Sequence, residues 1–440
     1  MFFLGILYSN EKIKFDYPDS LFIKQTLDSL ILAKNSMALK YELIHYDNEF
    51  KDIIYKPFYN SNKLDTVIIT SDKSIKTPYL KHMSKNFSNF YIDKEINTNI
   101  EKKKKKIRNK YYFIRDEPEI NIGRYRSDQL GMLVNIYPKF DNYFSGIFGG
   151  AKAQDDRWKL NGEIDAHFEN IWGSTEKLIF QWKNIDSTNQ KFNFELHRPH
   201  LLKSGLGMIL KANYELINNN YTHMSYEINL ELLNGHYGSY YIGYIQGLIN
   251  ATDGGINKGF VSSEYNAFSF LFRNNSLNDM IMPTSGSKTN FELEIGKDNE
   301  IENFYVRYKN RSEIHMLISD RLNMCFKLFG EYINAINSDV GFSRKVSFGG
   351  VNSLRGYDDN RFSSSSVAIP AVEFQYNDKN LISPVFFFEG GFSKDHSPKI
   401  SYGLGLKKIT NNAIVNIEYA IPLILPFNEG KVHIKWLTRL

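Results

Sequence analysis

The chain has 440 residues and a formal net charge of only +5, so its composition gives no argument for binding nucleic acid. No apolar stretch approaches the roughly 18 residues that a transmembrane helix needs, which excludes a helical membrane protein. The one cysteine, Cys325, excludes an intramolecular disulfide and says little about the redox compartment. The length suits one large barrel with a small appendage.

Residues 1–14 are predicted either as a partial signal or leader or as an ordinary first strand. Met1 to Tyr8 form a short apolar run similar to the core of a secretion signal. The run lacks a basic region before it and a clear small-residue cleavage site after it. The sequence leaves both alternatives open.

Residues 15–62 are predicted to form a small module with one helix and two strands. Asp19 or Ser20 can cap the helix, whose apolar residues fall on one face. These apolar residues are Ile23, Leu27, Leu30 and Ile31. Strand-like runs follow at Leu39 to Tyr46 and at Phe50 to Phe58.

Residues 63–138 are predicted to form a second module with the order strand, helix, helix, strand, strand. Thr77 and Pro78 open the first helix, and Asp93 can cap the second. The lysine run Lys102 to Lys106 lies on the second helix and favours a solvated face over a binding patch. The predicted strands are Leu64 to Thr70, Tyr111 to Ile122 and Leu130 to Tyr137.

From Asn142 onward apolar and polar residues alternate, which is typical of strands with one apolar face. Alternation alone does not separate a soluble sandwich from a membrane barrel. The predicted strands are about ten residues long and repeat along the rest of the chain, and a strand of about 9 to 11 residues crosses an outer membrane. Lipid tolerates such strands only in a closed sheet. Residues 139–440 are therefore predicted to form an antiparallel transmembrane β-barrel.

The barrel is predicted to have sixteen strands, eleven before a loop at about 338–366 and five after it, an even number that suits a single bacterial chain. These strands are 143–153, 158–169, 176–185, 189–197, 205–216, 222–233, 238–248, 264–273, 286–297, 303–317, 321–333, 366–377, 383–393, 399–408, 412–420 and 430–440. Acids on their polar faces indicate a water-filled interior rather than paired catalytic carboxylates. The acids are Glu163, Asp165, Glu227, Glu231, Glu292 and Glu294.

The loop contains a glycine-rich run with one arginine, which predicts a loop that folds back into the barrel. The run consists of Gly349, Gly350, Val351, Asn352, Ser353, Leu354, Arg355, Gly356 and Tyr357. Glycines allow tight turns, and a buried guanidinium needs a carboxylate partner. Glu389 supplies one, because strand parity places it on the lumenal face with Val385 and Phe387. Glu373, lumenal by the same parity, is a second candidate.

This run resembles the arginine-glycine-aromatic motif in the sixth extracellular loop of BamA, TamA and the two-partner-secretion transporters. Its place after eleven predicted strands and before five is also that of the family. Phe387-Phe388-Glu389-Gly390-Gly391 resembles the family's Phe-x-Asp-x-Gly segment in the barrel wall, with Glu389 in place of the usual Asp. The resemblance implies that Arg355 folds into the lumen and contacts Glu389. The pattern of Leu160-x-Gly162 through Asn170, with Arg198-Pro199 ending the fourth strand, resembles short members of the kind found in Bacteroidetes.

The element order of residues 63–138 resembles that of a POTRA domain, the periplasmic module that precedes such barrels, and residues 15–62 resemble a degenerate copy. The resemblance implies a barrel among outer-membrane lipids with its N-terminal region in the periplasm. It implies unfolded polypeptide clients as partners, with accessory periplasmic chaperones or lipoproteins, and no nucleic acid. An exposed sheet edge in the module would accept an extended client strand by β-augmentation.

Enzyme motifs are absent from the sequence: it has no G-x-S-x-G, no phosphate-binding glycine loop and no H-E-x-x-H. His197 and His200 flank Pro199 without an evident third ligand, so we predict no metal there, and no cofactor or catalytic residue elsewhere. The predicted function is insertion of barrel proteins or export of polypeptides without covalent chemistry. The alternatives are a passive channel or structural barrel, and an exporter dedicated to one secreted partner.

Overall fold

The computed structural model describes residues 8–9, 12–15, 19–33, 39–47, 52–59, 62–87, 90–92, 95–126, 129–152, 158–186, 188–201, 206–235, 237–279, 282–299, 304–336, 338–377, 382–410 and 413–439. Residues 1–7 of the predicted leader and Asp93, the predicted cap, lie outside these ranges. The chain divides into two compact units. The first comprises Met1–Thr70, Met83–Lys105 and Pro118–Ile136, and the second Ser71–His82, Lys106–Glu117 and Tyr137–Leu440.

The first unit begins with a small sheet and one helix, α1 (Ser20–Ala33). Asp19 caps α1, because its Oδ1 accepts a hydrogen bond from Leu21 N at 3.0 Å. Ile13, Phe15, Ile23 and Ile53 form the buried core between helix and sheet. Two short strands pair within residues 8–15. The sheet order is β1 (Tyr8–Ser9), β2 (Lys12–Phe15), β4 (Asp52–Tyr59) and β3 (Leu39–Asp47).

The next elements follow the predicted order of strand, helix, helix, strand, strand. Three strands form a sheet with β9 (Gln129–Ile136) between β6 (Thr66–Ser71) and β8 (Glu119–Arg126). The helices are α2 (Thr77–Ser84), which continues into the 3₁₀ turn η1 (Lys85–Phe87), and α3 (Ile96–Lys110). The short strands β5 (Asn62–Lys63) and β7 (Tyr91–Ile92) pair separately.

The strand predicted at Tyr111 to Ile122 is wrong for its first part. Residues 111–118 form turns and irregular backbone, and β8 begins only at Glu119. Tyr111, Phe113 and Ile114 are buried, so the apolar residues that led to the strand prediction fill a core instead. On α3, Lys103 donates a hydrogen bond to Asn86 O at 2.7 Å, and Lys104 pairs with Glu101 at 2.9 Å. These local contacts fit the solvated-face interpretation of the lysine run.

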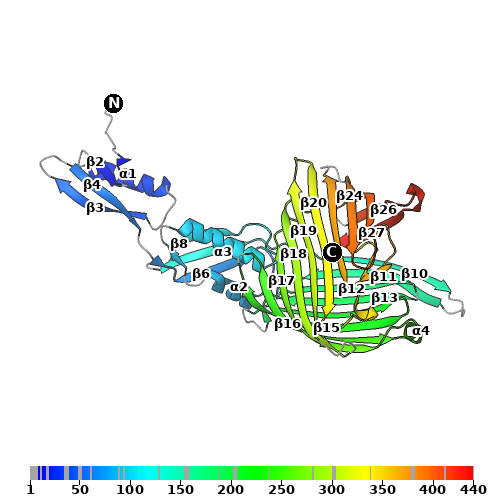
Figure 1. Ribbon diagram of the computed structural model, residues 1–440. Helices are drawn as coiled ribbons and strands as arrows, with labels where there is room; N and C mark the ends of the chain where they lie inside the picture. The colour runs from blue at the N-terminus through cyan, green and yellow to red at the C-terminus, as the bar shows by residue number, and fades with distance from the viewer. Residues whose placement is uncertain are drawn as a thin grey trace. The chain divides into compact units, whose positions relative to one another are not determined.

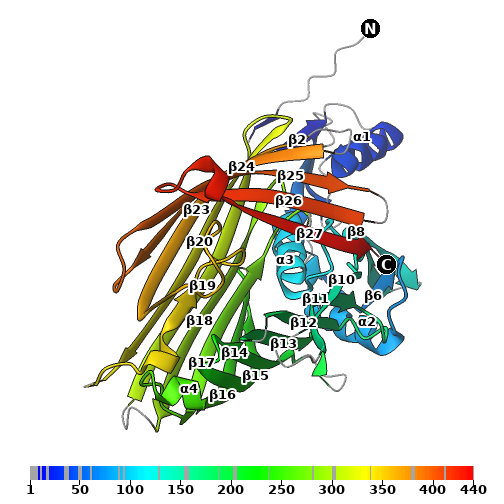
Figure 2. The same ribbon diagram turned by 90° about the vertical axis from the view of Figure 1, so that its right-hand side faces the viewer.

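Within the described residues, sixteen antiparallel strands close into one barrel, eleven before the long loop and five after it, as predicted (Figures 1 and 2). Short elements interrupt the connections: α4 (Asp253–Ile256) precedes β17, and η4 (Phe427–Glu429) precedes β27. The strands before the loop are β10 (Tyr143–Lys152), β11 (Trp158–Glu169), β12 (Lys177–Asp186), β13 (Asn189–Arg198), β14 (Met208–Ile217), β15 (Tyr221–Asn234), β16 (Ser239–Ala251), β17 (Ser263–Asn275), β18 (Gly286–Asp298), β19 (Phe304–Leu317) and β20 (Leu322–Ala335). Those after it are β23 (Ser366–Tyr376), β24 (Ile382–Ser393), β25 (Lys399–Ile409), β26 (Ala413–Pro422) and β27 (Lys431–Arg439).

The predicted alternation of inward and outward residues holds along the strands. On β24, Phe387 and Glu389 are buried inside the barrel, whereas Phe386 and Phe388 are exposed on its outer surface. The predicted lumenal acids are buried except Glu163, which is exposed. Most are neutralised by nearby cations: Lys211 Nζ, for example, lies 2.8 Å from Glu227 and 3.0 Å from Glu292. These ion pairs give the acids a structural role in a polar interior.

The barrel closes between its first and last strands over a very short ladder. Among the described residues, β10 and β27 pair only at Tyr143 with Arg439 and at Phe144 with Thr438. On its other edge β10 pairs with β11 over the ten positions from Tyr143 to Lys152. We call the β10–β27 junction the seam. Because a longer ladder makes more backbone hydrogen bonds, the seam is the weakest closure of the wall among the described residues.

Segments that precede the barrel in the sequence pack against one of its turns, within the second unit. Lys76 N donates a hydrogen bond to Gly173 O at 3.0 Å, and Asn170 Nδ2 donates to Ser74 O at 2.8 Å. The turn needs left-handed backbone, and Asn170 and Gly173 have φ of 57° and 65°. Tyr112 donates its hydroxyl to Glu176 O at 2.8 Å, and burial raises the pKa of Tyr112 well above its ordinary value.

Candidate functional site

The loop between β20 and β23 folds into the barrel and joins its hydrophobic core. It carries the 3₁₀ turn η3 (Phe342–Arg344) and a two-stranded hairpin of β21 (Val346–Phe348) and β22 (Phe362–Ser364). Phe348, Leu354 and Tyr357 are buried in one cluster with wall residues that include Tyr265 and Tyr305. Such burial of large apolar side chains is worth roughly 1.5–3 kcal/mol for each. The loop is therefore a packed part of the barrel interior.

The glycines of the run shape a compact turn that presents Arg355 to the wall. Gly349, Gly350 and Gly356 have φ of 118°, 89° and 87°, which favours glycine at each position. Ser353 Oγ accepts a hydrogen bond from Gly349 N at 2.8 Å and donates one to Gly349 O at 2.9 Å. Gly350 N also donates to Leu354 O at 3.0 Å, so the run closes on itself.

Arg355 contacts the acid that the sequence predicted and two others. Its backbone N donates to Glu389 Oε2 at 2.9 Å, and its Nε donates to Glu389 Oε1 at 2.6 Å. Its Nη2 lies 2.5 Å from Glu373 Oε1, and its Nη1 lies 3.2 Å from Glu418 Oε2. The guanidinium also stacks 3.6 Å from the ring centre of Phe387. One buried arginine is thus the shared counterion of acids on β23, β24 and β26. We call Arg355 with these three acids the arginine anchor.

The remaining predicted motif residues support this anchor by close packing. A Cβ on Gly391 would lie 2.8 Å from Leu354 Cδ2, so only glycine leaves room for the buried leucine. Gly356 lies against Ile421 and Pro422 of β26 in the same way. Tyr357 is buried, and its hydroxyl donates to Ile400 O at 3.4 Å. The structure therefore brings the whole predicted set of loop and wall residues together.

Sequence reasoning missed Glu418 and a second buried arginine, Arg344. Arg344 Nε lies 3.1 Å from Asp298 Oδ2, and its guanidinium stacks 3.6 Å and 4.5 Å from the ring centres of Tyr265 and Tyr305. Strand parity would have identified Glu418, because it places this residue on the inner face of β26. No signal in the sequence marks Arg344, because its partners come from β17, β18 and β19, far away along the chain.

Two exposed ion pairs hold the outer part of the loop to strands on both sides of the seam. Asp358 pairs with Lys431 on β27, and Asp359 lies 2.6 Å from Lys183 on β12. The hydrogen bond from Lys431 lowers the pKa of Asp358, so this carboxylate stays ionised at neutral pH. Exposed pairs of this kind contribute at most about 1 kcal/mol each.

His197 and His200, weighed above as metal ligands, are not brought together with a third ligand. His197 Nε2 lies 3.4 Å from the Tyr241 hydroxyl. The His200 ring packs instead among the rings of Tyr79, His82 and Tyr111.

Comparison with known proteins identifies the family. The family model described as the Omp85 superfamily domain matches residues 141–436, which is most of the chain and nearly all of the barrel. The chain belongs to the Omp85 superfamily. It is thus a 16-stranded β-barrel of an outer-membrane family, and the resemblance to BamA, TamA and two-partner-secretion proteins is confirmed at this level. No match is found among curated proteins.

Solved structures of Omp85 proteins share the fold at low sequence identity. BamA from Haemophilus ducreyi lacking POTRA domains 1–3 matches with a TM-score of 0.52 and 12% identity, over 95% of this chain and 93% of that one. CdiB from Escherichia coli matches with a TM-score of 0.58 and 12% identity, over 96% and 84%. CdiB from Acinetobacter baumannii gives 0.56 and 12%, over 94% and 79%. The family supports an outer-membrane function of insertion or secretion type. No helix among the described residues is long and apolar enough to cross a membrane.

Proposed function

We propose that this Omp85 protein handles unfolded polypeptides at the outer membrane, inserting barrel proteins or exporting polypeptides without covalent chemistry. The observation that carries the proposal is the seam, where β10 and β27 pair at only two positions. Beyond those positions both strands keep backbone N–H and C=O groups that do not pair across the seam. A client in extended conformation would pair with such groups.

The loop in this mechanism keeps the wall beside the seam intact while the seam itself opens. The arginine anchor ties β23, β24 and β26 to the loop through buried charges. The pair of Asp359 with Lys183 is exposed and lies on the other side of the seam, so it is inexpensive to break. The loop would therefore stay with β23–β27 when the seam parts.

The elements before the barrel supply sites where a client would dock first. In the first unit, β8 and β3 lie at the edges of their sheets, and each has one side that pairs with no other strand of the described residues and would accept an extended peptide. We place this region in the periplasm, where clients arrive and where accessory chaperones or lipoproteins would meet it. The exposed outer surface of the barrel, with Phe268, Phe386 and Trp436, would face the lipids of the outer membrane.

A disulfide across the seam tests the proposal. Phe144 and Thr438 are register partners, so the pair Phe144→Cys and Thr438→Cys would lock β10 to β27 under oxidising conditions. The matched control keeps Phe144→Cys and joins it to Ala166→Cys, its partner on β11. Cys325 is buried and can remain in both variants.

The readout is the outer-membrane and secreted proteome of cells that depend on each variant. The variant with the locked seam should lower client levels as depletion of the protein does, and a reductant should restore those levels. The control variant should leave client levels unchanged. Loss of many barrel proteins would indicate insertion, and loss of one secreted protein would indicate a dedicated exporter. Unchanged levels with the seam fully locked would defeat the proposal in favour of a passive or structural barrel.

A further inference from the structure

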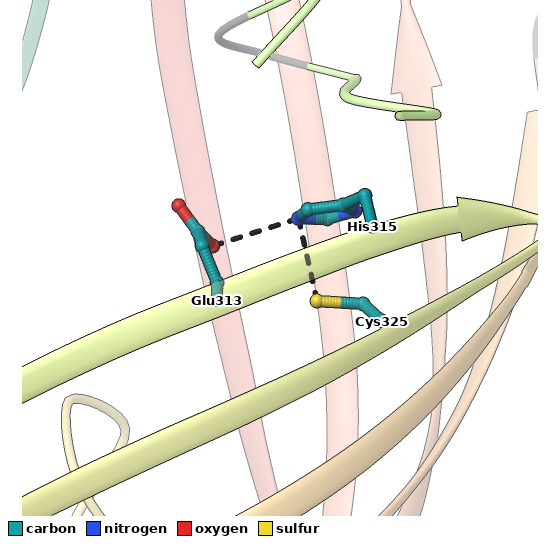
Figure 3. A group of neighbouring side chains, drawn as sticks. All are labelled: Glu313, His315 and Cys325. Atoms are coloured by element: carbon teal, nitrogen blue, oxygen red, sulfur yellow. Dashed lines mark hydrogen bonds and ion pairs between the residues drawn. The ribbon is translucent and has the colours of Figure 1, made fainter. Parts of the chain in front are cut away.

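Three side chains of metal-ligating type meet on the inner wall beside the arginine anchor, because Cys325 is the register partner of Glu373. Glu313 and His315 lie on β19, and Cys325 lies on β20 as the register partner of His315. Cys325 Sγ is 3.3 Å from His315 Nε2, and Glu313 Oε2 is 3.6 Å from the same nitrogen. Figure 3 shows the carboxylate and the sulfur approaching one edge of the imidazole from two sides. All three ligand atoms lie within 4.8 Å of one another.

His315 and Cys325 are buried on the lumenal face, and Glu313 is half-buried. His315 and Cys325 are 8% and 3% exposed, whereas Ile314 and Met316, the neighbours of opposite parity, are exposed on the outer surface. The site lies near the turn that joins β19 to β20, at the opposite end of β20 from the inward-folded loop.

The spacing fits a tetrahedral metal ion. With Zn–S of about 2.3 Å and Zn–N and Zn–O of about 2.0–2.1 Å, tetrahedral angles place neighbouring ligand atoms roughly 3.3–3.6 Å apart. The sulfur–nitrogen and nitrogen–oxygen distances of 3.3 Å and 3.6 Å already match these edges. Thiolate, imidazole and carboxylate are also the three ligand types that zinc prefers in proteins.

The surroundings of the cluster supply the partners that metal ligands need. Glu313 Oε1 points to Lys288 Nζ at 3.9 Å, which leaves Oε2 for the ion. Asn323 Nδ2 lies 3.4 Å from His315 Nδ1, and the buried Oδ1 of Asn323 has no hydrogen-bond partner among the described residues. Ligation through Nε2 puts the imidazole proton on Nδ1, and a turned Asn323 amide would then accept it through Oδ1. That turn breaks the present hydrogen bond from Asn323 Nδ2 to Pro283 O at 2.8 Å.

We propose that Glu313, His315 and Cys325 bind one zinc-type divalent cation, with the fourth coordination position open to water. Binding deprotonates the Cys325 thiol and releases that proton to solvent, and the ion then joins β19 to β20 inside the barrel. The site is independent of the proposed handling of polypeptides, since none of its three ligands belongs to the seam or to the arginine anchor.

Cobalt(II) is a direct probe, because its bond to a thiolate gives a sulfur-to-metal absorption band in the near ultraviolet. The purified full chain in detergent, stripped with a chelator, should take up one cobalt ion with this band, and zinc should displace it. Cys325→Ser should lose the band. His315→Gln and Glu313→Gln should each weaken binding roughly tenfold or more. His223→Gln, a lumenal histidine bonded to the Tyr265 hydroxyl at 2.8 Å, is the matched control and should bind as the parent does.

Heat-modifiable mobility on gels shows whether each variant remains a folded barrel, and Glu313→Gln keeps the test informative if the cysteine variant does not fold. Absence of the band in the folded parent protein would overturn the proposal. Equal cobalt binding by the parent and a folded Cys325→Ser chain would do the same. Stoichiometric zinc in the protein as isolated, measured by mass spectrometry, would support it further.

Discussion

Replacing Arg355 by Ala should release the loop from the lumen without unfolding the barrel. The change removes the shared counterion of Glu373, Glu389 and Glu418, whose carboxylates then face one another in a buried site. Removing one partner of a buried ion pair typically costs about 3–5 kcal/mol. At about 1.4 kcal/mol for each factor of ten, the docking equilibrium of the loop should shift by roughly two to three and a half orders of magnitude. The strand ladders stay intact, so the barrel persists.

Amide hydrogen exchange measures this shift directly, because the docked loop protects identifiable backbone groups. Arg355 N is bonded to Glu389, and Gly350 N is bonded to Leu354 O. Both amides should exchange faster in Arg355→Ala by the factor given above, while amides in the centre of β24 stay protected. Arg361→Ala is the control, since Arg361 belongs to the same loop but its side chain is 54% exposed.

Glu389→Gln distinguishes a shared anchor from a single pair. The amide keeps an oxygen that accepts one of the two hydrogen bonds from Arg355, and Glu373 and Glu418 remain charged. The loop should therefore open less than in Arg355→Ala. If loop protection in Arg355→Ala equals that of the parent chain, the reasoning about the anchor is wrong. If Glu389→Gln opens the loop as far as the arginine variant, the other two acids contribute nothing.

Further variants test the packing and charges around the anchor. Gly391→Val should destabilise the docked loop by about 1–3 kcal/mol, because its side chain overlaps Leu354, and Leu354→Ala in the same chain should recover the loss of amide protection. Arg344→Met removes the cation 3.1 Å from the buried Asp298 and should lower the temperature of the heat-modifiable gel shift, with Asp298→Asn restoring it; failure of that rescue would argue against the pair. Asp358→Asn and Asp359→Asn remove exposed pairs, so each should change loop exchange less than about tenfold, and a larger effect would show that these pairs are stronger than their exposure suggests.

The barrel and the centre of the site could be predicted from the sequence because both follow from local patterns. Alternation with period two fixes which residues face inward, and it placed Phe387, Glu389 and Glu373 on the lumenal side before any pairing was known. A buried arginine demands an acid, which limited the partners of Arg355 to the few acids on the nearby inner faces. These two constraints left Glu389 and Glu373 as candidates, and the resemblance to the family's barrel-wall segment pointed to Glu389.

The features that were missed depend on register and on distant segments. Cys325 meets His315 only because β19 and β20 pair in one particular register, and a shift by one residue would separate them. Arg344 depends in the same way on three strands that precede it. Residues 111–118 were wrongly predicted as part of a strand, because their apolar side chains fill a core although the backbone forms no strand. Burial alone does not specify backbone conformation.

The arginine anchor and the seam together determine where the wall of the barrel parts. Glu373, Glu389 and Glu418 are lumenal on three of the five strands after the loop, and Lys327 lies 2.8 Å from Glu373. The loop arginine offsets the negative charge of these three buried acids, so the wall of β23–β26 and the docked loop stabilise each other. The last strand β27 joins this block through its ladder with β26 and through Lys431 with Asp358. Its opposite edge has two pairs with β10, whereas described neighbours elsewhere in the wall share at least the seven of β23 with β24. Any force that parts the barrel should therefore act at the seam and leave the loop attached to β23–β27.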